Sequence, residues 1–128
     1  MATIHHPCAP FALAWGTESI LAGGCDKKIQ VYDRSGKSKQ YFDYSRDEKD
    51  HEFSVACASP SGQCVIFGTF NRLRIYQWSA KRRIWEEAST KDFQNFYTMT
   101  AICWRKDGTR VAVATLPGGL HYFESILR

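Results

Sequence analysis

The sequence lacks the features that would place it in a membrane or on a secretion route. None of its apolar runs approaches the roughly 18 residues that a membrane span needs. The first residues, Met1 to Pro7, contain no basic region followed by a long apolar one, so we expect no secretory leader. These absences predict a cytoplasmic protein.

Catalytic and cofactor-binding motifs are also missing. The chain has no G-x-S-x-G nucleophile motif, no glycine-rich phosphate loop and no H-E-x-x-H zinc motif. Its four histidines have no partner in the sequence at a spacing that makes a site. They are His5, His6, His51 and His121. We therefore predict no enzyme, no cofactor and no metal site.

The five cysteines show no pairing pattern. Their number is odd, and no two of them have the two-residue gap of a zinc knuckle or a redox motif. Cys57, Cys64 and Cys103 fall inside apolar runs, where a free cysteine behaves as a small hydrophobe. We predict buried, reduced thiols, as in a cytosolic compartment.

Charge of one sign is not concentrated anywhere. Seventeen basic residues face thirteen acidic ones, a formal net charge of +4, and no stretch has the single-sign run of a nucleic-acid-binding tail. We expect a solvated surface of mixed sign and no nucleic-acid partner.

What the chain does contain is one unit repeated three times, at about 8–44, 52–88 and 96–128. Each copy has three short apolar runs separated by turns rich in glycine, proline or aspartate. Gly62 and Gly108 are 46 residues apart, and Tyr32 and Tyr76 are 44 apart. A period in the mid-forties with short strands is typical of a propeller blade.

The apolar pattern of the runs supports sheets stacked face to face. The middle run of each copy is apolar at consecutive positions, which predicts a strand buried on both faces. In a third run, Leu73 and Ile75 alternate with Arg74, Tyr76 and Trp78. A fourth, outer strand fits residues 40–44 and 83–87, although the second segment also fits a short helix. The third copy has no room for an outer strand.

We therefore predict an all-β protein, with residues 1–128 forming a partial propeller of about three four-stranded antiparallel blades. The copies resemble WD40 repeats, with Tyr32-Asp33 at the position of the Trp-Asp pair. Gly-His dipeptides are absent, so the hydrogen-bonded side-chain tetrad of that family is in doubt. Because three blades do not close a propeller, both flanking blades should expose apolar faces. We therefore expect the isolated chain to be marginally stable, to aggregate or to pair with another copy.

Longer segments resemble the intraflagellar transport protein 172 family in order and spacing, from about residue 5 to 128. They include HPCAPFALAW at 6–15, SPSGQCVIFGTFNRLRIYQW at 59–78 and FYTMTAICWRKDGTRVAVATLPGG at 96–119. The match is to the later blades of the first N-terminal propeller of that family. This resemblance implies a non-catalytic scaffold of ciliary complex B that acts in cilium assembly. It implies other complex B subunits as partners, kinesin-2 indirectly, and location in the cytoplasm, cilium, axoneme and basal body.

Two segments are candidate interaction surfaces. An acidic connector contains Arg46, Asp47 and Glu48, and its mixed charge equally fits a solvated loop. A basic turn, Lys81, Arg82 and Arg83, lies between two tryptophans and suits an anionic lipid or an acidic partner, or merely a connector between strands. Alternative functions are a scaffold of another membrane-trafficking coat and a binding module for anionic lipid or RNA.

Overall fold

The computed structural model describes residues 3–124, in which eleven strands form three antiparallel sheets. The first sheet contains β1 (Ala12–Gly16), β2 (Ser19–Gly23), β3 (Lys28–Tyr32) and β4 (Ser38–Asp43). The second contains β5 (Val55–Ala58), β6 (Cys64–Gly68), β7 (Arg72–Ser79) and β8 (Ile84–Asp92). The third contains β9 (Met99–Trp104), β10 (Val111–Thr115) and β11 (Leu120–Phe123).

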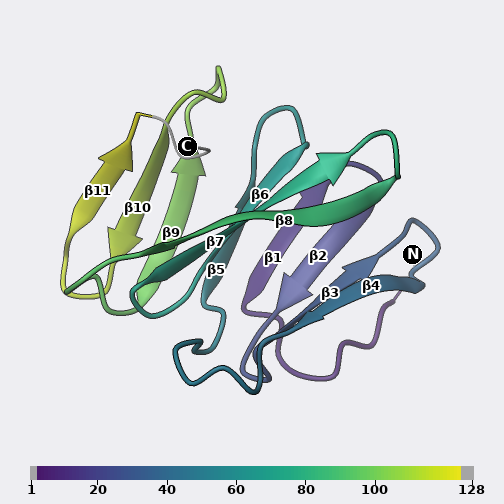
Figure 1. Ribbon diagram of the computed structural model, residues 1–128, viewed down its shortest axis with the longest axis horizontal. Helices are drawn as coiled ribbons and strands as arrows, with labels where there is room; N and C mark the ends of the chain where they lie inside the picture. The colour runs from purple at the N-terminus through teal and green to yellow at the C-terminus, as the bar shows by residue number, and fades with distance from the viewer. Residues whose placement is uncertain (1–2, 125–128) are drawn as a thin grey trace.

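In each sheet the strands follow chain order, as in a blade. Figure 1 shows the three blades side by side, with β1–β4 at one side, β5–β8 in the middle and β9–β11 at the other side. The innermost strands β1, β5 and β9 contact one another in that order. The predicted all-β fold of incomplete WD40-like blades is confirmed.

The middle blade is buried on both faces because its side chains alternate between two cores. Along β6, Val65 and Phe67 join a cluster with the first blade, whereas Cys64 and Ile66 join a cluster with the third. Along β7 the predicted alternation holds, since Leu73 and Ile75 face the third blade and Tyr76 faces the first. The period-two pleat thus lets one strand stabilise two interfaces.

Hydrogen bonds between blades repeat at the spacing of the units. The Thr17 amide donates to the Gly62 carbonyl at 2.8 Å, and the Ser54 hydroxyl donates to the Met99 carbonyl at 2.6 Å. The side-chain amide of Gln40 donates to the Trp85 carbonyl at 2.9 Å and accepts from the Trp85 amide at 2.8 Å. In all three cases the partners are 45 residues apart. Equivalent positions of neighbouring blades therefore meet.

The outer strand predicted at residues 83–87 is present as β8, so the helix that this segment also fitted does not form. Two other sequence predictions need correction. The middle run of the third copy is not buried on both faces: Val111 and Val113 are buried, but Ala112 and Ala114 are only half-buried. The thiols are not all buried either, since Cys25 and Cys103 are exposed and Cys8 and Cys57 are half-buried. The exposure of Cys103 and of its cross-strand neighbour Ala112 shares one cause, since no further described blade covers the outer face of the third sheet.

Both flanking faces expose large apolar side chains, as expected. On β1 and just before it, Phe11, Leu13 and Trp15 are exposed, while the alternate Ala12 and Ala14 are buried against the middle blade. At the other side, exposed side chains include Leu116, Leu120 and Tyr122.

Residues 3–124 include no helix that is long and apolar enough to cross a bilayer.

Candidate functional site

A pocket of about 490 Å³ lies where the inner strands of the three blades begin. Phe11, Ser54 and Thr98 line it, and each directly precedes the inner strand of its own blade, β1, β5 or β9. These positions are 43 and 44 residues apart, so the repeat itself places one residue of each blade at the pocket. We call this surface the inner-strand pocket.

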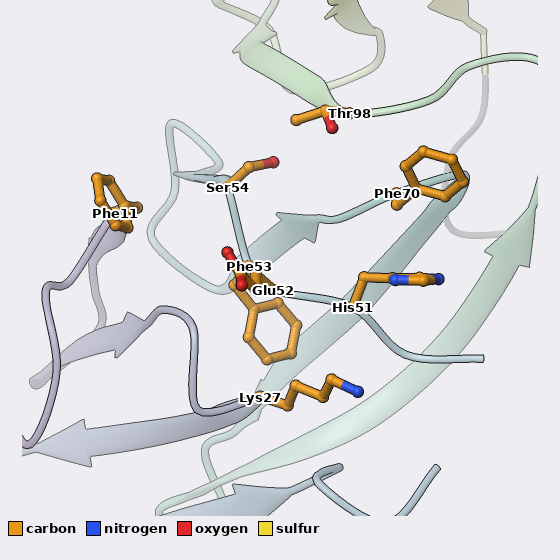
Figure 2. Close-up of a pocket in the computed structure, with 8 residues that line it drawn as sticks. All are labelled: Phe11, Lys27, His51, Glu52, Phe53, Ser54, Phe70 and Thr98. Carbon is orange, nitrogen blue, oxygen red and sulfur yellow. The ribbon is translucent and has the colours of Figure 1, made fainter. Parts of the chain in front are cut away.

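The remaining lining comes from loops at the same end of the blades. Lys27 belongs to the β2–β3 turn and Phe70 to the β6–β7 turn. His51, Glu52 and Phe53 belong to the segment that enters the middle blade. Figure 2 shows these side chains arriving from several separate segments of the chain. Loops on a rigid sheet scaffold are the usual place for binding residues.

The chemistry of the pocket suits binding. The exposed rings of Phe11 and Phe70 provide an apolar wall, whereas the Phe53 ring is buried in the core. The centroid of the His51 ring lies 5.0 Å from that of Phe70. Lys27 and Glu52 add one charge of each sign. The Ser54 hydroxyl donates to backbone carbonyls, so it is held in a structural role. An apolar wall with a few charged groups is the pattern of a recognition site.

The acidic connector, residues 44–52, lies beside this pocket and is not uniformly solvated. Arg46, Asp47 and Glu48 are exposed, as expected for a loop, but the Asp50 side chain is fully buried. Its carboxylate accepts two hydrogen bonds from Arg74. Arg74 Nε donates to Asp50 Oδ1 at 3.0 Å, and Arg74 Nη2 donates to Asp50 Oδ2 at 2.7 Å. Arg72 Nη1 lies 3.3 Å from the same carboxylate. The connector is therefore fastened to the start of β7.

Both arginines are buried and make further contacts. The Arg72 Nε donates to Asp92 at 2.6 Å, and the Arg74 guanidinium carbon lies 3.7 Å from the centroid of the Tyr44 ring. Burial alone raises the pKa of Asp50, but the hydrogen bonds and charge of Arg74 outweigh it and leave that pKa below its ordinary value. Asp50 is thus held as a carboxylate between two cations.

Tyrosine hydroxyls extend this network into the core. The Tyr44 and Tyr76 hydroxyls are 2.5 Å apart, and Tyr44 also donates to Glu87 on β8. Burial raises the pKa of both tyrosines, so both stay neutral. The sequence cast doubt on the WD40 side-chain tetrad. The structure has the Asp50–Arg74–Tyr44–Tyr76 chain of contacts joining the connector to the strands, which we call the connector network.

The basic turn lies at the other end of the blades. It follows the end of β7, whereas Asp50 contacts the start of that strand, so the two are separated by roughly 23 Å at 3.3 Å per residue. Figure 1 shows the β7–β8 turn and the β4–β5 connection at opposite ends of the middle blade. The six predicted interaction residues are therefore divided between two separate surfaces.

The cations of the basic turn are exposed but partly compensated. Arg82 lies 3.3 Å from Glu86, and Arg83 pairs with Glu18 of the first blade. Trp85, directly after the turn, is buried against Gly16, where an added Cβ would lie 2.6 Å from the ring. Trp78 packs on Trp85 with ring centroids 5.5 Å apart. Trp85 therefore packs in the interior and the half-buried Trp78 packs against it, which fits the interpretation of this turn as a connector.

Sequence reasoning missed the inner-strand pocket because no motif contains it. Its residues come from five separate segments, of which only 51–54 contributes more than one residue, and only the fold brings them together. The available signal was the spacing of Phe11, Ser54 and Thr98, each immediately before the first apolar run of its unit.

The three antiparallel sheets and the pocket at their inner ends define the chain as a set of WD40-like propeller blades. No protein-family model matches the chain. It is 50% identical over 98% of its length to the Intraflagellar transport protein 172 homolog of Mus musculus. It is 52% identical over 96% to the homolog of Danio rerio, and 36% identical over 96% to Intraflagellar transport protein 172 of Chlamydomonas reinhardtii.

The chain is therefore homologous, over nearly its whole length, to a segment of intraflagellar transport protein 172. It spans about 7% of the length of each of these relatives. The sequence-based resemblance to this family is confirmed.

Proposed function

We propose that the chain acts as a non-catalytic scaffold segment of an intraflagellar transport complex B subunit, in intraciliary transport and cilium assembly. The observation that carries this proposal is the identity of 50% over 98% of the chain to proteins named for intraflagellar transport. The partners are other complex B subunits, with kinesin-2 as an indirect one. The site of action is the cytoplasm and the cilium, including its axoneme and basal body.

The inner-strand pocket is the surface we assign to a partner. Its rim carries exposed aromatic side chains, Phe11 and Phe70, beside Lys27 and Glu52. Aromatic side chains surrounded by a polar rim are typical of the residues that dominate binding energy. An extended segment with one apolar side chain and one acidic side chain fits this composition, because Lys27 pairs with the acid and the exposed Phe70 ring packs on the apolar group.

The basic turn supports the alternative of anionic-lipid binding less well than the sequence suggested. Two of its three cations already face carboxylates, Arg82 with Glu86 and Arg83 with Glu18. Their attraction for phosphate headgroups is reduced accordingly.

Affinity purification from ciliated cells tests the proposal. The tagged chain should recover complex B subunits, and Lys27→Glu should reduce that recovery about tenfold. Lys81→Glu, the same charge change at the opposite end, should leave recovery unchanged. Equal recovery with both variants would show that the inner-strand pocket is not the partner-binding surface. Failure of the unaltered chain to recover any complex B subunit would contradict the scaffold role.

A further inference from the structure

Three side chains lie together where the segment before β1 meets the β2–β3 turn of the first blade. One ring nitrogen of His6, the Sγ of Cys8 and a carboxylate oxygen of Asp26 lie within 4.8 Å of one another, and all three residues are half-buried. His6 and Cys8 belong to the N-terminal segment before β1, and Asp26 belongs to the β2–β3 turn. The cluster thus joins two segments that are not paired by strand hydrogen bonds.

The His6 ring is held but incompletely bonded. Its Nδ1 lies 2.8 Å from the Tyr32 hydroxyl, and the two rings pack edge to face with centroids 5.9 Å apart. Its Nε2 is buried and has no hydrogen-bond partner in the part of the chain that the structure describes. A buried polar atom without a partner costs about 1–3 kcal/mol, so its presence requires an explanation. A neutral imidazole nitrogen without a hydrogen-bond partner is able to coordinate a cation.

The other two groups are fixed by backbone contacts. The Lys28 amide donates to Asp26 Oδ1 at 3.2 Å, which orients the carboxylate. Gly24 lets the N-terminal segment lie directly against the end of β2, since an added Cβ there would be 2.3 Å from the Ala9 carbonyl oxygen and 2.9 Å from Cys8 Sγ. Metal ligands held in this way by neighbouring groups are pre-positioned.

We propose that His6, Cys8 and Asp26 form a binding site for a zinc ion, with water as the fourth ligand. Imidazole nitrogen, thiolate and carboxylate are the ligand types that Zn²⁺ takes, at about 2.0–2.3 Å. Tetrahedral ligands at these lengths are about 3.5 Å apart, so the cluster closes by no more than about 1.3 Å. Binding releases the Cys8 proton, and it ties the N-terminal segment to the β2–β3 turn.

The site stands apart from the proposed scaffold function. The predicted absence of a metal rested on motif spacing, and His6-Pro7-Cys8 with a distant Asp26 matches no recognised zinc motif. Three ligands from two segments far apart in the chain become neighbours only through the fold. The ion would have a structural role, holding the segment before β1 against the β2–β3 turn of the first blade.

Cobalt titration tests this site directly, because Co²⁺ takes the same ligands and shows a thiolate charge-transfer absorption. The metal-free chain in reducing buffer should bind one equivalent of Co²⁺ with that absorption, and Zn²⁺ should displace it. Cys8→Ser should abolish the absorption, and Asp26→Asn should weaken Zn²⁺ binding at least tenfold. The matched control, Cys103→Ser, removes an exposed thiol elsewhere and should bind as the unaltered chain does.

Two results overturn the proposal. One is the absence of a stoichiometric thiolate absorption in the unaltered chain. The other is unchanged Co²⁺ absorption in Cys8→Ser, which places the metal on another thiol. Circular dichroism identifies a variant that has failed to fold. In that case His6→Asn takes its place, and it too should weaken Zn²⁺ binding at least tenfold.

Discussion

The acidic connector and the basic turn have similar charge density in the sequence but opposite physical roles in the structure. The connector buries Asp50 between Arg72 and Arg74, whereas the turn leaves its three cations in solvent. Coulomb attraction is screened far less in the interior than at the surface, and an unpaired buried charge is expensive. Charge in the connector therefore determines stability, whereas charge in the turn is available for other uses.

The largest effect should come from Asp50→Ala. It leaves two buried guanidinium groups without their shared carboxylate, and loss of one partner of a buried ion pair costs about 3–5 kcal/mol. Urea unfolding followed by circular dichroism measures this loss.

The control for Asp50→Ala is Asp92→Ala. Asp92 also pairs with Arg72, but its side chain is 64% exposed, so the change should cost about 1 kcal/mol at most. Equal losses in the two variants would show that burial does not separate the two aspartates.

Tyr44→Phe should have a smaller effect in the same region. It removes the hydroxyl that contacts the hydroxyl of Tyr76. The Tyr76 side chain is fully buried, so its hydroxyl loses that hydrogen bond. A loss of about 1–2 kcal/mol is expected in the free energy of unfolding. No change in unfolding would mean that the connector network ends at Arg74.

Acid should weaken the connector by a predictable route. The pKa of Asp50 lies below its ordinary value of about 4 in the folded chain, so its contribution to stability is present above about pH 4. That contribution is lost as the pH falls through the lowered folded pKa. The stability of the unaltered chain should therefore fall more steeply below pH 4 than that of Asp50→Asn. Parallel pH profiles from urea unfolding would contradict the assignment.

The smallest effect should come from reversing the turn. Replacing Lys81, Arg82 and Arg83 together with glutamate removes only exposed, screened contacts and should change the free energy of unfolding by about 1 kcal/mol or less. Urea unfolding of the triple variant checks this, beside Asp50→Ala under the same conditions. A loss as large as that of Asp50→Ala would show that the turn is structural as well.

The sequence predicted the blades better than it predicted these two loops. Strand positions and the two-faced burial of β6 follow from local apolar patterns and the repeat period. The burial of Asp50 does not, because its partners lie 22 and 24 residues later, on a strand whose polar positions look solvent-facing. Exposure of Cys103 was missed for a related reason: the pattern indicates a strand but not whether another blade covers it.

The inner-strand pocket could not be predicted from a motif either. Its lining residues become neighbours only after three blades stack, so its chemistry belongs to the assembly of repeats and not to one segment. The sequence left the basic turn open between a binding surface and a connector between strands, and the burial of Trp85 directly after it fits the connector.

A pair of double-mutant cycles in urea unfolding tests the contrast between the two loops most directly. One cycle combines Asp50→Ala with Arg74→Ala, and the other combines Arg82→Ala with Glu86→Ala. The buried pair should give a coupling energy of about 2–3 kcal/mol, and the exposed pair one below about 1 kcal/mol. A buried-pair coupling no larger than the exposed-pair coupling would contradict the account.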